Sequence, residues 1–246
     1  RDRRMTRLHK ALNARLDKAV LEYNMLQQND AVLVAVSGGA DSMALLELLS
    51  LHIWHYAEKM RLHAVYVDLG FGENALERCS IIETYFQRLR VDYEIVQTDI
   101  GPYAHSDANR ERPCFLCSRM KRKKIFETAE QLGCNKIVFG HHKDDIIETL
   151  LINMIWGREI STMSPNLAVF EGTYHILRPM VYIEEELVKK FCRERNTPVV
   201  EQDCPTDGHS KRQFVKEWLD ELEDEIGGAK ENIFASMKRV KTDYLL

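Results

Sequence analysis

The feature that most constrains the fold of this chain is an apolar run that leads through a glycine turn directly into a helical pattern. Ala31 to Val36 is apolar throughout, which is typical of a parallel strand buried on both faces. Ser37, Gly38 and Gly39 then form a turn, and from Asp41 onward apolar residues recur at helical spacing. At such a turn the backbone N–H groups point outward and the helix dipole favours negative charge. The sequence therefore predicts an anion site between this strand and the helix that follows it.

The residue order in this turn, Ser-Gly-Gly-x-Asp-Ser from Ser37 to Ser42, distinguishes it from the two common phosphate loops. It lacks the Gly-Lys-Ser/Thr sequence of the Walker loop and the third glycine of the dinucleotide fingerprint. It resembles the PP-loop of ATP pyrophosphatases, enzymes that cleave ATP between the α- and β-phosphates. The alternative is a tight turn that only joins a strand to a helix. The ordered match in a strand–helix setting favours the PP-loop.

Strands and helices alternate through most of the chain. The predicted strands are Ala31–Val36, Leu62–Val67, Tyr93–Gln97 and Lys136–Phe139, and the helices that follow them end near Ala57, Leu89, Leu132 and Trp156. A polar loop from Thr98 to Pro113 precedes the third of these helices. Such alternation predicts a Rossmann-like α/β fold, in which a parallel sheet carries helices on both faces. Ligands of these sheets bind at the carboxyl ends of the strands.

The pattern changes at both ends of the chain. Residues 5–27 predict an amphipathic N-terminal helix. After Trp156 we expect a hairpin with strands at Ala168–Phe170 and Tyr174–Leu177, a helix at Glu184–Arg195, a short strand at Val199–Val200, and charged helix from Lys211 onward. We therefore expect an N-terminal helix at 1–28, a nucleotide-binding domain at 29–200 and a C-terminal extension at 201–246.

Composition limits the partners and the compartment. The formal net charge of −4 does not indicate a general nucleic-acid binder, so any RNA-binding surface is expected to be local. No apolar run approaches the roughly 20 residues that cross a bilayer, and the basic start has no signal-peptide pattern. The six cysteines of this α/β pattern predict reduced thiols or metal ligands. These features predict a cytoplasmic protein without a membrane partner.

A second strong pattern is the Cys-x-x-Cys pair formed by Cys114 and Cys117 at the start of a helix that continues with basic residues. A helix N-terminus and nearby cations are expected to lower the pKa of both thiols. Thiolates at this spacing suit an iron–sulfur cluster, a zinc ion or a redox dithiol, and the pair alone does not choose between them.

Cys204, in a turn between a predicted strand and a helix, is the best candidate for a third ligand. The remaining cysteines lie in or beside helical patterns and are predicted to be buried and inert, namely Cys79, Cys134 and Cys192. Three protein ligands would leave one iron of a cluster open to an external sulfur.

The third pattern is the run Gly-His-His-Lys-Asp-Asp at Gly140–Asp145, which ends one predicted strand and begins a helix. Asp68 ends another strand, so both positions fall at the same edge of the sheet as the glycine turn. We expect Asp144 to cap the helix and Asp145 to carry out chemistry. The two histidines could alternatively belong to a turn with no role in binding.

These motifs together resemble the TtcA family of tRNA-cytidine 2-thiolases, relatives of the TtuA 2-thiouridine enzymes. The resemblance rests on the PP-loop, Cys-x-Leu-Cys-Ser-Arg, Gly-His-His-Lys-Asp-Asp-x-x-Glu-Thr, and a late cysteine followed by Lys-Arg-Gln, and it covers roughly residues 15 to 220. It implies a fold of the adenine nucleotide alpha hydrolase (HUP) type. It also implies ATP-dependent sulfur transfer to an anticodon-loop cytidine, with adenylation of the base and a [4Fe–4S] cluster.

The resemblance also assigns roles by position. It implies that Cys114, Cys117 and Cys204 are cluster ligands, with the first two also taking part in catalysis, and that Asp145 and Lys121 are catalytic. It places ATP against Ser37, Gly38, Gly39, Asp41, Ser42, Asp68, Gly140 and His141. Asp145 would bind Mg²⁺ or move a proton, and the sequence leaves both roles open.

Partners follow from the same resemblance. Its implied cofactors are ATP, Mg²⁺ and the cluster, and its implied partners are tRNA and a sulfur donor, either a cysteine desulfurase or sulfide. A homodimer is possible. The basic run of Arg119, Arg122, Lys123 and Lys124 predicts contacts to tRNA phosphates, with a solvated helix face as the alternative.

Two other functions remain open from the residues alone. A PP-loop ligase like tRNA-lysidine synthetase would adenylate cytidine but transfer an amine, and it would not need the three cysteines. A zinc-stabilised module that binds ATP or AMP without chemistry is the other.

Overall fold

The computed structural model describes residues 5–53, 60–200, 204–205 and 211–244. Its strands are β1 (Ala31–Val36), β2 (Arg61–Asp68), β3 (Asp92–Gln97), β4 (Lys136–Phe139), β5 (Asn166–Val169) and β6 (Tyr174–Leu177). Its α-helices are α1 (Arg7–Glu22), α2 (Ala40–His52), α3 (Ala75–Leu89), α4 (Ile100–Ala104), α5 (Pro113–Leu132), α6 (Lys143–Ile152), α7 (Glu185–Arg195), α8 (Lys211–Ile226) and α9 (Ala229–Ser236). A π-helix (Asn153–Gly157) extends α6, and a 3₁₀ turn (Thr242–Tyr244) follows α9.

All six strands form one sheet in the order β3-β2-β1-β4-β6-β5. The strands β3, β2, β1, β4 and β6 pair in parallel, and only the edge strand β5 pairs antiparallel, with β6. The predicted Rossmann-like parallel sheet is therefore confirmed, and the predicted hairpin forms its antiparallel edge. β1 is buried along its whole length, as its unbroken apolar sequence predicts.

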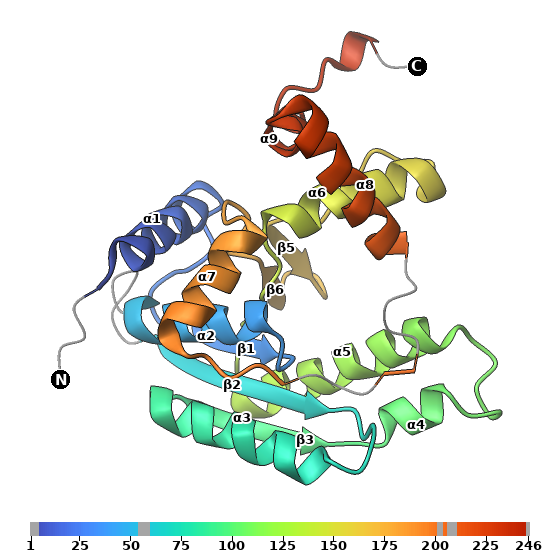
Figure 1. Ribbon diagram of the computed structural model, residues 1–246. Coiled ribbons are helices and arrows are strands. Elements are labelled where there is room, and N and C mark those ends of the chain that lie inside the picture. Colours follow the sequence, from blue (N-terminus) through green and yellow to red (C-terminus); the bar gives the residue numbers. More distant parts are fainter. Residues whose placement is uncertain (1–4, 54–59, 201–203, 206–210, 245–246) are drawn as a thin grey trace.

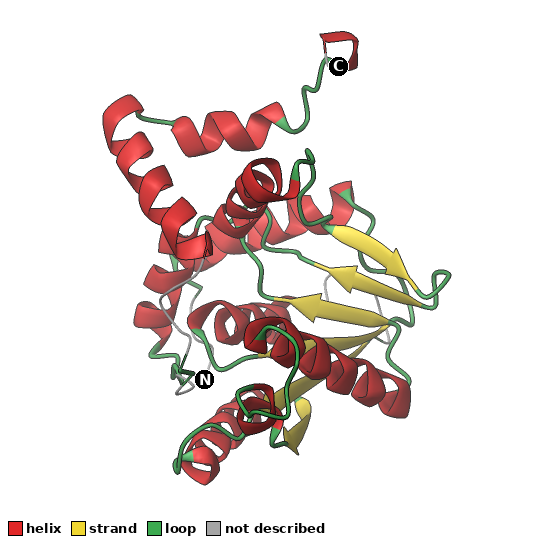
Figure 2. Cartoon of the chain, turned by 90° about the vertical axis from the view of Figure 1, so that its right-hand side faces the viewer, coloured by secondary structure: helices red, strands yellow, loops and turns green. Residues whose placement is uncertain are grey.

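Helices cover both faces of the sheet (Figures 1 and 2). On one face, α1, α2, α3 and α7 supply apolar side chains to the larger core cluster, which includes Leu16, Leu45, Phe86 and Phe191. On the other face α4 and α5 build a second cluster around Leu33. Because each face is closed by helices, the polar groups collect at the carboxyl edge of the strands.

The helices α8 and α9 lie over α6, away from the sheet (Figure 1). Val215 and Leu219 of α8 pack on Ile147 of α6 in a small separate cluster. The C-terminal part of the chain is thus anchored on the helix that begins with the His-His-Lys-Asp-Asp run. The described helices include none whose length and apolar character would let it traverse a bilayer.

Two local predictions are wrong. Val199–Val200 does not form a strand, although the Val200 N–H donates to the carbonyl of Gly38 at 2.9 Å. The polar loop before the cysteines contains a short helix, α4, because buried Ile100 and Ala104 hold it against the sheet and α5. Neither segment is long enough for its periodicity to identify its structure.

Candidate active site

The serine–glycine turn between β1 and α2 is closed by its own hydrogen bonds. The Ser37 N–H donates to Ser42 Oγ at 3.0 Å, and the Ser42 hydroxyl in turn donates to the Gly39 carbonyl at 3.0 Å. Gly39 is the N-cap of α2 and provides no side-chain cap. The first turn of α2 therefore has no capping side chain, and its N–H groups form the kind of anion site that the sequence predicts.

Two glycines allow three segments to approach each other at this turn. Gly38 has φ +91°, and a Cβ on it would lie 2.8 Å from the Val200 carbonyl oxygen. A Cβ on Gly140, at the end of β4, would lie 2.8 Å from the backbone nitrogen of Ser42. Both sites are therefore closed to any larger residue without movement of the backbone.

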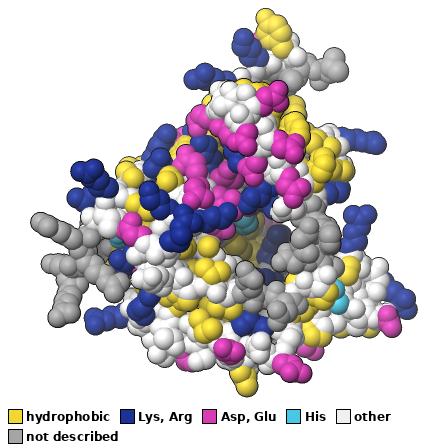
Figure 3. Space-filling view, viewed as in Figure 1, with side chains coloured by type: hydrophobic (Ala, Val, Ile, Leu, Met, Phe, Trp, Pro, Cys, Tyr) yellow, Lys and Arg dark blue, Asp and Glu magenta, His cyan; other side chains and the backbone are white. Residues whose placement is uncertain are grey.

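A cavity of about 350 Å³ opens at the carboxyl ends of β1 and β4. It is lined by Ala35, Ser37, Asp41, Ser42, Ser118, Lys121, Arg122, Ile125, Phe139, Gly140, His141 and Asp145. The surface is hollowed near the middle of this face, and histidine and basic side chains are visible inside (Figure 3). Three sequence motifs that lie far apart in the chain therefore meet at one cavity.

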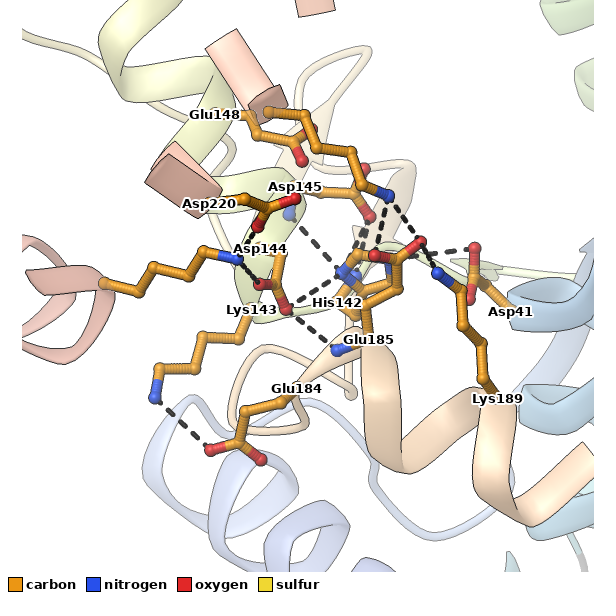
Figure 4. Close-up of polar contacts among 12 residues, drawn as sticks. Asp41, His142, Lys143, Asp144, Asp145, Glu148, Glu184, Glu185, Lys189 and Asp220 are labelled. Atoms are coloured by element: carbon orange, nitrogen blue, oxygen red, sulfur yellow. Dashed lines mark hydrogen bonds and ion pairs between the residues drawn. The ribbon is translucent and has the colours of Figure 1, made fainter. Parts of the chain in front are cut away.

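The His-His-Lys-Asp-Asp run forms one wall of the cavity. His142, not Asp144, is the N-cap of α6: its ring accepts from the Asp145 N–H, and Asp145 accepts from the His142 N–H at 2.9 Å. The prediction that Asp144 caps the helix is wrong, because the extended backbone of His142 places its ring over the first turn. His142 also lies 3.7 Å from Asp41, across the cavity edge (Figure 4).

His141 faces the cavity as a neutral imidazole. Burial lowers its pKa to about 4, despite the opposing effect of Asp145. Its Nδ1 is buried and has no hydrogen-bond partner in the described part of the chain. A buried polar atom without a partner in a cavity is available to a ligand. Burial also raises the pKa of Asp41, so the carboxyl group beside the turn holds its proton to a higher pH than usual.

Asp145 is held by an arginine that the sequence analysis did not single out. Arg212 of α8 contacts Asp145 Oδ1 at 2.7 Å and Glu148 at 2.9 Å, and it donates to Thr149 at 3.2 Å. The two oxygens of Asp145 are therefore both engaged, one by Arg212 and one by the backbone of His142. Only the Lys-Arg-Gln sequence after the last cysteine hinted at this residue.

The two residues before Asp145 are also held by the C-terminal helices. Lys143, which is 7% exposed, pairs with Glu231 of α9 and lies 3.4 Å from Glu184. Asp144 lies 3.6 Å from Lys230 of α9. Three successive residues at the start of α6 are thus paired with α8 or α9.

The opposite wall of the cavity is one face of α5. Ser118, Lys121 and Arg122 line the cavity, and Cys114 and Cys117 lie on the same helix up to two turns earlier. Burial lowers the pKa of Lys121, while Cys117 opposes that effect. One helix therefore connects the nucleotide cavity with the cysteine pair.

The cysteines gather at the N-terminal end of α5. The pKa of Cys117 is raised, mainly by burial, and the thiols of Cys114 and Cys204 add to this effect while Lys121 opposes it. The expected net lowering of this thiol's pKa is therefore wrong, because burial outweighs the effect of Lys121. Among the residues that the structure describes, no three His, Cys, Asp or Glu side chains are grouped to hold a metal ion.

The other cysteines are buried, as predicted. Burial raises the pKa of Cys79, and it raises those of Cys134 and Cys192 to about 11. Thiols with such pKa values are poor nucleophiles and poor ligands at neutral pH.

Asp68 is not brought into the cavity. It is 1% exposed, and its carboxylate accepts from Arg78, from Tyr66 and from the N–H of Gly70. Asp68 is therefore paired with Arg78 at the end of β2. A contact between Asp68 and ATP stays a prediction.

The basic run on α5 divides into two parts. Arg122 lines the cavity, whereas the other three residues form ion pairs on the helix surface, Arg119 with Glu111 at 2.7 Å and Lys123 and Lys124 with Glu127 at 3.8 and 2.8 Å. Exposed pairs of this kind are weak and can be replaced by phosphate contacts. The run remains a predicted RNA contact.

Comparisons with known proteins agree with this geometry. The model of the PP-loop domain family matches residues 8–222. The chain is 34% identical to a tRNA-cytidine(32) 2-sulfurtransferase of Dechloromonas aromatica over 98% of this chain and 84% of the relative. It is also 34% identical to the enzyme of that name from Geobacter sulfurreducens, over 97% of this chain and 93% of the relative.

One solved structure is similar over nearly the whole fold. The U34-tRNA thiolase NcsA from Methanococcus maripaludis, determined with its [4Fe-4S] cluster, superimposes with a TM-score of 0.79 at 20% identity. The match covers 97% of this chain and 81% of NcsA. At this identity the similarity establishes a common fold.

Proposed function

The chain belongs to the PP-loop family and, within it, to the tRNA-cytidine(32) 2-sulfurtransferases, and from this premise we propose how its site performs ATP-dependent thiolation of tRNA. The enzyme adenylates the C2 oxygen of an anticodon-loop cytidine and then replaces that oxygen with sulfur. The observation that carries this proposal is the shared helix α5: it lines the nucleotide cavity with Lys121 and Arg122 and carries Cys114 and Cys117 at its start.

The first step is transfer of AMP to the base. The C2 oxygen attacks the α-phosphorus of ATP, the bond to the oxygen bridging to the β-phosphorus breaks, and pyrophosphate leaves. The N–H groups at the start of α2, with Ser37 and Ser42, bind the leaving pyrophosphate. The Nδ1 of His141 is available to the nucleotide, since it is buried, neutral and unpaired.

The second step replaces the activated oxygen. The phosphate ester is a far better leaving group than the original oxygen, so a sulfur nucleophile attacks C2 and AMP departs with that oxygen. Lys121 stands between the thiols and the nucleotide: it lies about 6 Å along the helix axis from Cys117. Its lowered pKa makes it a more ready proton donor than an ordinary lysine.

The donor chemistry of the cysteines fits a [4Fe–4S] cluster. Cys114, Cys117 and Cys204 influence one another electrostatically at one end of α5, and thiolates are the usual ligands of such clusters. Held by these three residues, a cluster would supply a sulfur at the iron that the protein leaves free. This ligand set belongs to the proposal, as do a cysteine desulfurase or sulfide as sulfur donor and a homodimer.

Mg²⁺ is the proposed counter-ion of the phosphates. Asp145 lines the cavity and is its candidate ligand, and movement of a proton is the alternative role. Because Arg212 occupies one oxygen of Asp145, either role changes this ion pair.

The function is tested by incubating anaerobically purified protein with ATP, sulfide and unmodified tRNA. Nucleoside mass spectrometry should find one oxygen of a cytidine replaced by sulfur, together with release of AMP and pyrophosphate. Iron and acid-labile sulfide are measured in parallel on wild type and on Cys204→Ala. We expect near four irons per chain in wild type and their loss in the variant.

Cys134→Ala is the matched control, because it removes a buried cysteine outside the proposed ligand set. Zinc in place of iron, with Cys204 irrelevant to its binding, would contradict the cluster and favour a ligase. Absence of pyrophosphate release on adding tRNA would contradict the adenylation step.

A further inference from the structure

A second arginine, Arg178, comes directly after β6, next to β4, whose carboxyl end lines the cavity. Leu177 pairs with Val138 of β4, so Arg178 comes next to Phe139, which lines the cavity. Residues that pair across parallel strands point to the same face of a sheet. Phe139 packs on the cluster beneath α5, which places Arg178 on that face too.

Arg178 is buried and poorly satisfied. It is 8% exposed, and its Nη1 donates to the carbonyl of Ser164, while its buried Nε has no hydrogen-bond partner among the residues that the structure describes. Across the described parts of the chain, neither Arg178 nor Arg122 forms an ion pair with a carboxylate. A buried charge without a partner is strongly unfavourable, so its presence indicates a ligand of opposite charge.

Arg122 approaches the same point from α5. It lines the cavity, and its positive charge acts on Arg178. The pKa of Arg178 is lowered to about 10, first by burial and then by Arg122. Arg178 also acts on His141, which lines the cavity and has its own unpaired Nδ1. The charge of Arg178 is therefore close enough to interact with both Arg122 and His141.

We propose that Arg122, which lines the cavity, and Arg178, which lies beside it, form a second phosphate-binding subsite apart from the serine–glycine turn. Guanidinium groups bind phosphate oxygens through paired N–H donors, and two of them neutralise one phosphate group. The Nε of Arg178 and the Nδ1 of His141 supply the unsatisfied polar atoms that such a ligand would engage.

The source of this phosphate rests on the proposed function. The turn at Ser37–Ser42 takes the pyrophosphate end of ATP, so the second subsite binds either the α-phosphate of the nucleotide or an RNA phosphodiester beside the target base. Both present the same chemistry to the arginines, and an experiment with two probes separates them.

The test compares wild type with Arg178→Gln and Arg122→Gln. ATP binding without RNA is measured by calorimetry, and binding of an anticodon stem–loop RNA is measured by fluorescence anisotropy at several KCl concentrations. Each variant should weaken one probe by about tenfold or more, the loss expected for a charge-assisted contact. Weaker ATP binding identifies the α-phosphate. Weaker RNA binding, with the salt slope reduced by about one, identifies the phosphodiester.

Arg90→Gln is the matched control, since it removes an exposed arginine outside the cavity lining and should leave both affinities unchanged. Arg178→Lys keeps the charge but loses the planar pair of donors, so it should retain part of the affinity even where Arg178→Gln folds poorly. Unchanged affinities for both probes in folded Arg122→Gln and Arg178→Lys would overturn the proposal. Arginine-dependent binding without thiolation would instead contradict the proposed function and leave the subsite standing.

Discussion

Arg212 and Asp145 show how one ion pair ties the C-terminal part of the chain to the cavity. Replacing Arg212 with alanine frees Asp145 and leaves the buried carboxylate of Glu148, 4% exposed, without its partner. A hydrogen bond to a charged group is worth about 1.5–3 kcal/mol. We therefore expect tRNA-dependent pyrophosphate release to fall about 10- to 100-fold in Arg212→Ala.

Two comparison variants isolate this effect. Arg193→Ala removes an exposed ion pair with Glu186 on α7 and should keep wild-type turnover. Arg212→Lys keeps the charge but loses the contacts made through two guanidinium nitrogens, so it should recover part of the rate. Equal turnover in Arg212→Ala and wild type would show that the pair does not position Asp145.

His141 gives the protein a pH-dependent stability. Its pKa is about 4 in the folded protein and 6.5 as the ordinary value, so the unfolded chain takes up the proton first. Stability contributed by the neutral imidazole is therefore full above pH 6.5 and decreases as the pH falls toward 4. Between pH 6.5 and 5 we expect a loss of about 2 kcal/mol, at 1.36 kcal/mol per pH unit.

Urea unfolding of wild type and His141→Gln at pH 7.5, 6.5 and 5 measures this loss. The glutamine variant removes the titrating group, so its stability should change less on acidification than that of wild type. Parallel curves for the two proteins would show that His141 is not a neutral buried group.

The sequence identified most cavity residues but not their cationic partners. Ser37, Asp41 and Gly140 belong to short motifs with fixed neighbours, so their roles can be inferred locally. Arg178 belongs to no motif named from the sequence, and Arg212 stands in the Lys-Arg-Gln run without an assigned role. The importance of both arises from contacts across the fold. Asp68 looked equivalent to the other strand-end residues, and only the fold reveals that Arg78 satisfies it.

At the scale of elements, the approach of β4 to the start of α2 depends on one glycine. Gly140→Ala places a Cβ at 2.8 Å from the backbone nitrogen of Ser42, so the two elements must separate. We expect a loss of about 1–3 kcal/mol in the free energy of unfolding and weaker ATP binding. Thermal unfolding and calorimetric titration measure the two effects.

Gly157→Ala serves as the control for this change. Its Cβ would meet no atom closer than 3.6 Å, and Gly157, like Gly140, does not have a positive φ. It should therefore retain ATP binding. If ATP affinity falls equally in Gly140→Ala and Gly157→Ala, the close approach of β4 and α2 does not form the ATP site.

The strands of the sheet and the long helices were predictable from sequence, whereas two short segments were not. Buried strands such as β1 and helices such as α5 carry enough periodic apolar residues to reveal their type. The segment Val199–Val200 has strand-forming residues, but the Val200 N–H donates to the carbonyl of Gly38 and not to a neighbouring strand, a contact that no local pattern contains. Likewise, His142 caps α6 because its backbone is extended after β4, and no local sequence pattern contains that conformation.

At the scale of the whole molecule, the C-terminal helices hold the start of α6. The double change Lys230→Ala with Glu231→Ala removes partners of Asp144 and Lys143. Lys143 is 7% exposed and would keep only Glu184. Since Glu231 is largely exposed, we expect a modest loss, about 1 kcal/mol, together with weaker ATP binding.

The measurement is urea unfolding with ATP titration, and Glu225→Ala provides an exposed acidic residue as control. If ATP affinity stays at the wild-type value while stability falls, α9 contributes to folding but not to the site. The parallel sheet with helices on both faces was expected from the alternation of strands and helices. This docking of α8 and α9 was not, because it joins residues that are distant in the chain.

The helix α5 also fixes the spacing between the cysteine pair and the nucleotide cavity. Successive residues of an α-helix are rotated by about 100° about its axis. One extra residue between Cys117 and Lys121 would therefore rotate the thiols by that angle relative to the cavity wall, while Lys121 keeps its position at the nucleotide cavity. If the cysteines deliver the sulfur as proposed, such a chain would still activate the base, but sulfur would approach from the wrong direction and water would hydrolyse the activated intermediate. The enzyme would then consume ATP without thiolating tRNA. The relative angular positions of Cys117 and Lys121 around one helix would thus link ATP consumption to thiolation.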